Sequence, residues 1–196
     1  MVSVIGPWVL RYSASASGFS SCNPYFTVTW GFFSIPSPAT SAGSIFEVSG
    51  AVESAGRIFH EGSEILDPFV LRFFLRAMTR TPDGRYLVLC QDEHNWFAPH
   101  DTVFVVQRLR PSVRDGCLDA VELCFAGDHR EPLDPGSLET EDGHLFCHVR
   151  RGAFRARFGR VAMQQLAPFL AEDGGEPALL LARGRHPIAS TTPVTI

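Results

Sequence analysis

Strand-length apolar runs follow one another through most of this chain, and only two stretches have the residue spacing of a helix. Runs such as 85–90, 117–125 and 144–149 are bounded by turn-forming residues, as β-strands usually are. Helical spacing is confined to a segment that starts at residue 67 and to residues 160–171. Consecutive strands with isolated helices predict an α+β fold with mainly antiparallel strands. No strand is followed by Gly-x-Gly-x-x-Gly, which argues against a dinucleotide-binding domain.

The first helix has a clear start signal. Asp67 is suited to cap the free N–H groups, and Pro68 suits the first helical position, where its missing N–H costs nothing. We expect this helix to run to about Thr79. Its apolar face is predicted to comprise Phe69, Val70, Phe73, Phe74 and Ala77, and a stripe on another face to comprise Arg72, Arg76 and Arg80.

Residues 1–46 differ from the rest, because they contain a single charged residue, Arg11, and are rich in serine, proline and aromatic residues. A membrane span needs about 20 consecutive apolar residues, and prolines interrupt the best candidate. The serine-rich stretch 13–21 likewise interrupts what a secretory signal would require. We therefore expect residues 1–51 to form a poorly ordered extension, and residues 1–50 to be dispensable for folding.

Composition excludes several classes of chemistry. All 17 basic residues are arginine, so Schiff-base enzymes and lysine-dependent phosphate loops are excluded. A net charge of −4 argues against a dedicated nucleic-acid binder, and no polybasic segment suggests membrane attachment. The five cysteines form no Cys-x-x-Cys pair, which favours reduced thiols in a cytoplasmic protein.

Two local clusters of reactive side chains were weighed and set aside. His94 and His100 lie near three acids, Asp92, Glu93 and Asp101, but their spacing fits no standard metal site and Pro99 bends the chain between them. We expect a polar turn there, with no metal and no cofactor. Cys147 and His148 are neighbours on an expected strand and so point to opposite faces. No catalytic residue is assigned, and an enzyme is the least favoured class of function.

Charge is segregated along the second half of the chain. Residues 128–142 hold six acids and one base, whereas residues 146–160 hold five arginines and no acid. One interpretation is that the two segments pair across neighbouring strands. The other is an anion site: strand alternation over 153–158 buries Phe154, Ala156 and Phe158 and turns two exposed arginines to the opposite side, next to a helix start at Gly159. On that interpretation we predict anion contacts from Arg155, Arg157 and Arg160, with Arg150 as an outlying fourth.

Several stretches together resemble a bacterial family known as domain of unknown function 1285. They are Gly56–Gly62, Leu71–Phe74, Asp83–Val88 and His148–Phe158, within a similarity that spans about residues 54–189. The resemblance implies two small α+β lobes, each with one main helix, that meet at a cleft with a ligand-binding or signalling role. We expect the lobes to cover residues 52–110 and 111–190, followed by a tail at 191–196.

The leading hypothesis is a soluble, non-catalytic binding or regulatory protein for a small anionic ligand, nucleotides included, held in the cleft between the lobes. The alternative from another class is a protein–protein adaptor that uses the aromatic N-terminal extension or the arginine stripe of the first helix. The sequence leaves the ligand and the oligomeric state open.

Overall fold

The computed structural model describes residues 4–5, 8–9, 46–90, 93–173 and 176–191. The chain divides into two compact units, Met1–Ser44 and Ile45–Ile196. In the first unit, β1 (Val4–Ile5) pairs antiparallel with β2 (Trp8–Val9). The prediction for the remainder of the N-terminal extension up to residue 45, and that for the tail at 192–196, fall outside the described residues.

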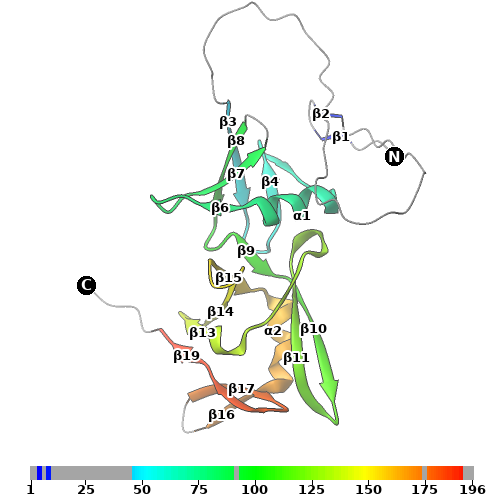
Figure 1. The fold of residues 1–196 in the computed structure, drawn as a ribbon, viewed down its shortest axis with the longest axis vertical. Helices are drawn as coiled ribbons and strands as arrows, with labels where there is room; N and C mark the ends of the chain where they lie inside the picture. Colours follow the sequence, from blue (N-terminus) through cyan, green and yellow to red (C-terminus); the bar gives the residue numbers. More distant parts are fainter. Residues whose placement is uncertain (1–3, 6–7, 10–45, 91–92, 174–175, 192–196) are drawn as a thin grey trace, which may run out of the picture. The chain divides into compact units, whose positions relative to one another are not determined.

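A six-stranded sheet opens the second unit, in the order β5-β4-β3-β8-β7-β6 (Figure 1). Its strands are β3 (Phe46–Val52), β4 (Ile58–His60), β5 (Ser63–Glu64), β6 (Thr79–Arg80), β7 (Tyr86–Cys90) and β8 (Glu93–Pro99). β3 pairs parallel with β8 on one side and antiparallel with β4 on the other. The ordered body therefore begins before residue 52, and the boundary expected there is wrong. Removal of residues 1–50 would delete most of a central strand, which argues against their being dispensable.

Helix α1 (Pro68–Ala77) begins as the sequence indicates. The Asp67 side chain accepts hydrogen bonds from the Phe69 and Val70 N–H groups, and Pro68 occupies the first turn. The helix ends two residues early, because Met78 is the C-cap and Thr79–Arg80 is strand β6. Its buried face was predicted wrongly in part: Leu71, Phe74 and Leu75 are buried, whereas Phe69 and Phe73 are exposed.

Three further sheets follow. A five-stranded sheet has the order β19-β13-β14-β15-β9, and the other two are three-stranded, β10-β11-β12 and β16-β17-β18. The strands of the first are β9 (Phe104–Val106), β13 (Glu139–Glu141), β14 (His144–Val149), β15 (Phe154–Phe158) and β19 (Ala189–Ser190). Those of the others are β10 (Arg108–Arg114), β11 (Cys117–Cys124), β12 (Arg130–Pro132), β16 (Leu170–Asp173), β17 (Glu176–Leu181) and β18 (Gly184–Pro187). The acid-rich segment 128–142 thus contains two strands, β12 and β13.

Helix α2 (Arg160–Leu166) is shorter than the expected 160–171. It passes into a 3₁₀ turn, η3 (Ala167–Phe169), that contains Pro168, and a proline inside a helix removes a hydrogen bond and clashes with the preceding turn. Two other 3₁₀ turns are η1 (Ala126–Asp128) and η2 (Pro135–Ser137). α2 packs on β10, where the Gln165 side chain accepts a 2.6 Å hydrogen bond from the Leu109 N–H.

Sheets of both parallel and antiparallel pairs with two α-helices confirm the α+β class. The two expected lobes share one apolar core, in which Phe74 and Val88 from the first and Leu123 and Phe154 from the second are buried together. The boundary expected at 110/111 falls inside β10, so the chain does not divide there. None of the helices among the described residues is long and apolar enough to span a membrane.

Candidate functional site

Strand β15 has the two faces that the sequence indicates. Phe154, Ala156 and Phe158 are buried, and Arg155 and Arg157 alternate with them. β15 lies between β14, its antiparallel partner, and β9, its parallel partner. Both arginines therefore point away from the apolar core, but different neighbours surround them.

Arg155 is held by the acids of β13. Its Nε donates to Glu139 Oε1 at 2.6 Å and its Nη1 to Glu141 Oε2 at 2.5 Å. The guanidinium carbon also lies 3.7 Å from the centre of the Phe146 ring. Burial would lower the pKa of Arg155, but these two carboxylates raise it above its usual value. For this residue the structure shows the ion-pairing alternative, with a side chain only 32% exposed.

Arg157 is more buried, with 12% of its side chain exposed. Its Nε lies 2.7 Å from Asp101 Oδ2, although the N–H is not aligned with that oxygen, and its Nη2 donates to the Ser54 carbonyl. The prediction that both arginines of β15 are exposed is thus wrong. Arg157 nevertheless borders an open pocket.

Arg150 belongs to another part of the structure. It lies in the turn after β14 with a positive φ of 52°, and its Nη1 donates to the Leu75 and Met78 carbonyls at the end of α1, at 3.3 and 2.7 Å. Its guanidinium also lies over the Phe154 ring, 5.1 Å from the centre. It lines neither of the pockets described below, so it is an anchor between elements and not an outlying anion contact.

The backbone of the same turn is fixed by Glu131. Its Oε2 accepts the Arg150 N–H at 2.7 Å, and its Oε1 accepts a hydrogen bond from the His129 Nε2 at 3.1 Å. Burial would raise the pKa of Glu131, but the hydrogen bonds from His129 and Arg150 hold it below its usual value of 4.5. Glu131, from the acid-rich segment 128–142, thus interacts with Arg150 of the arginine-rich segment in two ways. It accepts a hydrogen bond from the Arg150 backbone N–H, and its charge attracts that of the Arg150 side chain.

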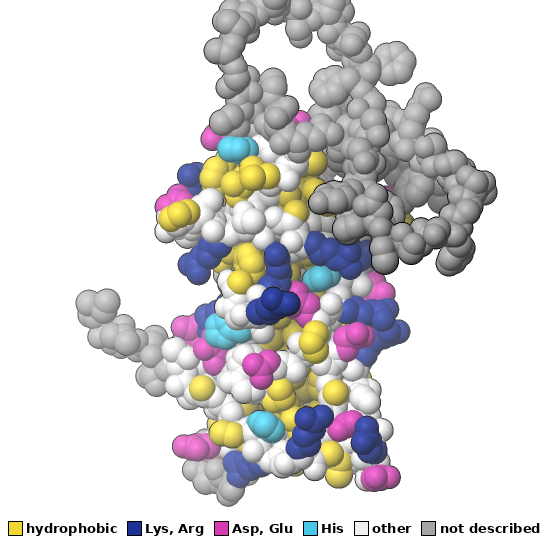
Figure 2. Space-filling view, viewed as in Figure 1, with side chains coloured by type: hydrophobic (Ala, Val, Ile, Leu, Met, Phe, Trp, Pro, Cys, Tyr) yellow, Lys and Arg dark blue, Asp and Glu magenta, His cyan; other side chains and the backbone are white. Residues whose placement is uncertain are grey.

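On the face shown in Figure 2, the segregation of charge along the sequence does not become a segregation of charge on the surface. Acidic and basic side chains are interspersed over the face shown in Figure 2. The reason is the topology, because β13 is hydrogen-bonded to β14 and β14 to β15, which places acids and arginines of the two segments within reach of one another.

One pocket, of about 470 Å³, brings Arg157 and Arg160 together, and we call it the Arg160 pocket. No acid is among its lining residues, and the exposed Arg160 makes no ion pair with any residue that the structure describes. Both expected lobes contribute to its lining: Ser54, Ala55, Gln107, Arg157, Gly159, Arg160 and Val161. Two of the four predicted contacts therefore share one pocket.

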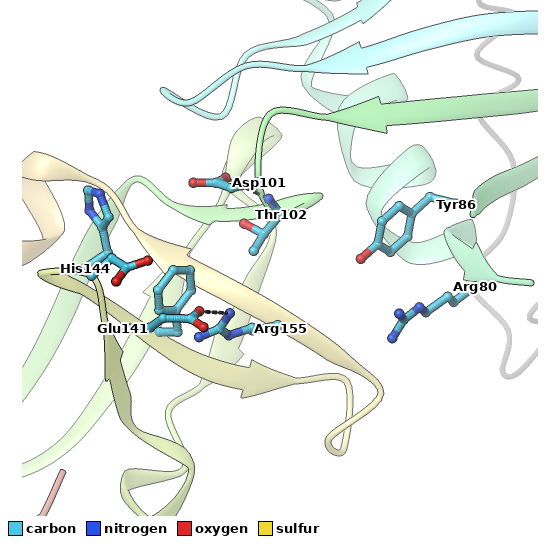
Figure 3. A pocket seen from close by; sticks show the side chains of 9 residues that line it. Arg80, Tyr86, Asp101, Thr102, Glu141, His144 and Arg155 are labelled. Atoms are coloured by element: carbon cyan, nitrogen blue, oxygen red, sulfur yellow. Dashed lines mark hydrogen bonds and ion pairs between the residues drawn. The ribbon is translucent and has the colours of Figure 1, made fainter. Parts of the chain in front are cut away.

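A second pocket, of about 350 Å³, contains Arg155 and was not predicted; we call it the Tyr86 pocket (Figure 3). Its lining residues come from the turn-connected pairs β6–β7 and β13–β14, from β15 and from the loop before β9: Arg80, Tyr86, Asp101, Thr102, Glu141, Asp142, His144, Phe146 and Arg155. Arg80 was expected on the first helix but lies in β6. No local motif marks this set, because its members are up to about 75 residues apart in the chain.

The residues weighed for metal binding do not converge. Among the described part of the chain, no three His, Cys, Asp or Glu side chains are grouped so that they could hold a metal ion. Asp101 instead pairs with Arg157, and His100 lies 3.9 Å from the same acid. Asp92 falls outside the described residues.

Comparison with known proteins bears on the fold. No family model and no curated protein matches this sequence. The crystal structure of a DUF1285 family protein from Silicibacter pomeroyi DSS-3 aligns with a TM-score of 0.57 and 16% identity, over 73% of this chain and 80% of that chain. This chain is similar in fold to that protein.

A DUF1285 family protein from Shewanella baltica OS155 also aligns, with a TM-score of 0.49 and 11% identity, over 61% of this chain and 90% of that chain. The alignment with the Silicibacter pomeroyi protein confirms, for the fold, the resemblance expected from the sequence motifs. At these identities the similarity concerns the fold alone.

Proposed function

We propose that this protein is a non-catalytic binding or regulatory protein for a small anionic ligand, of the phosphorylated-metabolite or nucleotide class, and that it works in the bacterial cytoplasm. The observation that carries the proposal is the meeting of Arg157 and Arg160 in one pocket without an acid in its lining. Guanidinium groups are well suited to phosphate and carboxylate because their N–H groups match two oxygens at once. The buried thiols of Cys124 and Cys147 are compatible with a reducing compartment.

The shape of the Arg160 pocket also supports a small molecule. A volume of about 470 Å³ lies within the range of roughly 300–1,000 Å³ usual for ligand sites. Gln107 is fixed at its rim, where its amide donates to the Ala55 and Gly56 carbonyls at 3.4 and 3.3 Å. Gln107 and Arg157 are thus held in place before a ligand arrives, by the Ala55 and Gly56 carbonyls and by Asp101 and the Ser54 carbonyl, respectively.

A catalytic role has less support. Burial raises the pKa of the Cys147 thiol to about 12, so this residue is not a thiolate nucleophile at neutral pH. Its neighbour His148 is exposed on the other face of β14. We therefore propose binding without chemistry.

The test is a thermal-shift screen of nucleotides and phosphorylated metabolites, followed by calorimetry with any hit. A ligand at 100 times its dissociation constant stabilises the native state by about 2.7 kcal/mol. We expect Arg160→Ala to weaken binding at least tenfold, about 1.4 kcal/mol, while Arg151→Ala removes an equal charge from an exposed site outside the pocket and leaves affinity unchanged. A flat screen at millimolar concentrations, or equal effects of the two variants, would reject the proposal.

A protein adaptor is the second candidate, because α1 and the residue before its cap expose large apolar side chains. Leu66, Phe69 and Phe73 are 75%, 60% and 39% exposed. The arginine stripe contributes less than expected, since Arg72 donates to the Gly127 carbonyl at 2.6 Å and Arg80 has left the helix. If an adaptor is correct, a partner that co-purifies with the wild type should be lost on Leu66→Ser and Phe73→Ser substitution.

A further inference from the structure

The Tyr86 pocket has walls of opposite charge. On one wall, Arg80 and Tyr86 are paired residues of β6 and β7, so their side chains share one face of the sheet. Arg80 is exposed and makes no ion pair with another described residue. Figure 3 shows its guanidinium and the Tyr86 hydroxyl on the same side of the pocket, facing Arg155 and Glu141.

A ring contact fixes the orientation of Tyr86 on this first wall. The Tyr86 ring stacks on Phe154 with a centroid distance of 6.2 Å and an interplanar angle of 29°. Phe154 is buried in the apolar core, so the phenol is held by a rigid neighbour while its hydroxyl remains at the pocket. The wall therefore offers one exposed cation, Arg80, and one fixed hydroxyl donor, Tyr86.

The opposite wall is acidic. Glu141 and His144 are paired across the tight turn Asp142–Gly143, whose two residues have positive φ values of 49° and 75°. Around it, three carboxylates, those of Glu139, Glu141 and Asp142, accompany a single guanidinium, that of Arg155. Asp142 is exposed and makes no ion pair within the described part of the chain.

We propose that the Tyr86 pocket binds a small zwitterion, with its carboxylate at Arg80 and the Tyr86 hydroxyl and its ammonium group at Asp142 and Glu141. A simple anion is disfavoured because it would face the acidic wall, and a simple cation would face Arg80. A molecule with both charges satisfies both walls, and the Phe146 ring lines the space between them. The volume of about 350 Å³ is sufficient for an amino acid or a slightly larger molecule.

The test uses ω-amino acids of increasing length, from glycine to aminohexanoate, together with the standard α-amino acids. Binding is measured by calorimetry on the full chain. We expect at least one zwitterion to bind, with the best chain length reporting the distance between the two walls. Its N-acetyl derivative, which lacks the cation, and its amide, which lacks the anion, should each bind at least tenfold more weakly.

Two variants and one control locate the site. Arg80→Gln and Asp142→Asn change exposed residues, and each should weaken binding of the zwitterion at least tenfold, with melting temperature unchanged in the absence of ligand. Arg76→Gln, an exposed arginine of α1 outside the pocket, should leave affinity unchanged. The proposal is overturned if no zwitterion binds at millimolar concentration, if the acetylated form binds as well as its parent, or if both pocket variants keep full affinity.

The two proposed sites share no lining residue, so each can be tested with its own ligand alone. Arg160→Ala should leave binding of the zwitterion intact, and Arg80→Gln should leave binding of a phosphorylated ligand intact. Either proposal can therefore fail while the other stands.

Discussion

Arg155 and Arg157 are two residues apart on the same face of one strand, yet their surroundings differ. Arg155 meets two carboxylates and an aromatic ring, and its charge is used within the fold. Arg157 meets one carboxylate and a backbone carbonyl, and it borders a pocket that also holds Arg160. Strand alternation thus decides which way an arginine points, but residues distant in the sequence decide whether its charge remains available to a ligand.

The other two arginines that were predicted to contact an anion differ in the same way: one is used within the fold and the other borders a pocket. Arg150 is built into the fold through the end of α1, whereas Arg160 makes no ion pair among the described residues. If this distinction between anchoring and pocket arginines is right, substitution of the anchors should change the free energy of unfolding, and substitution at the pocket should change affinity.

The largest loss is expected for Arg150→Ala. The change removes the donor to the Leu75 and Met78 carbonyls and the contact with Phe154, so we expect unfolding to become easier by about 2 kcal/mol. Arg151 is the matched control, because it is exposed and also has a positive φ, of 58°. Arg151→Ala should change urea denaturation by less than about 0.5 kcal/mol. Equal effects of the two substitutions would show that the contacts of Arg150 with the end of α1 do not stabilise the fold.

Arg155→Ala should cost about 1 kcal/mol, since the side chain is a third exposed and surface ion pairs are weak. The loss of stability on Arg155→Ala should be smaller when Glu139 and Glu141 are both glutamine. Without these two carboxylates, removal of Arg155 leaves no negative charge unpaired. A double-mutant cycle from urea denaturation measures this coupling. Additive effects would show that Arg155 does not interact with these acids in solution.

Glu131 provides a smaller effect that depends on pH. Its pKa is lowered in the native state, so the stabilisation that it provides is present above its usual value of 4.5 and is lost as pH falls through the native value. Glu131→Gln should cost about 1 kcal/mol or less at neutral pH and should make the acid limb of the stability profile less steep. An unchanged acid limb would mean that other carboxylates dominate it.

The smallest effect on folding is expected at Arg160. A cation in the first turn of a helix is slightly unfavourable, so Arg160→Ala should leave the free energy of unfolding within about 0.5 kcal/mol of the wild type, with any change toward greater stability. A large loss of stability on this substitution would place Arg160 among the anchors and weaken the assignment of the anion pocket.

Local signals in the sequence predicted local structure well. The cap at Asp67 and the proline at residue 68 indicated where α1 begins, and the alternation of apolar residues in β15 indicated its buried face. The buried stripe of α1 could not be deduced in the same way. Most of its circumference is apolar, so helical spacing alone does not distinguish the stripe with Leu71 and Leu75 from the one with Phe69 and Phe73.

Pairing between segments that are distant in the sequence accounts for the remaining differences between the predicted and the observed structure. The lobe boundary expected at 110/111 falls inside β10, which is an edge strand of its sheet, where Pro111 need not supply a hydrogen bond to a neighbour. The parallel pairs β3–β8 and β9–β15 join segments about forty to fifty residues apart and leave no local pattern. The Tyr86 pocket was missed for the same reason, because its walls become neighbours only after these pairings form.

The ion pair between Asp101 and Arg157 joins the two pockets, since the carboxylate lines one and the guanidinium lines the other. An anion that draws Arg157 toward itself leaves Asp101 with less of its counter-charge, and a cationic group near Asp101 is then held more tightly. If both proposed ligands bind, thermodynamic reciprocity requires that occupancy of the Tyr86 pocket raise the affinity for the anion by the same factor. A single salt bridge would thus make the protein respond to two ligands jointly, with a coupling free energy that Asp101→Asn should abolish.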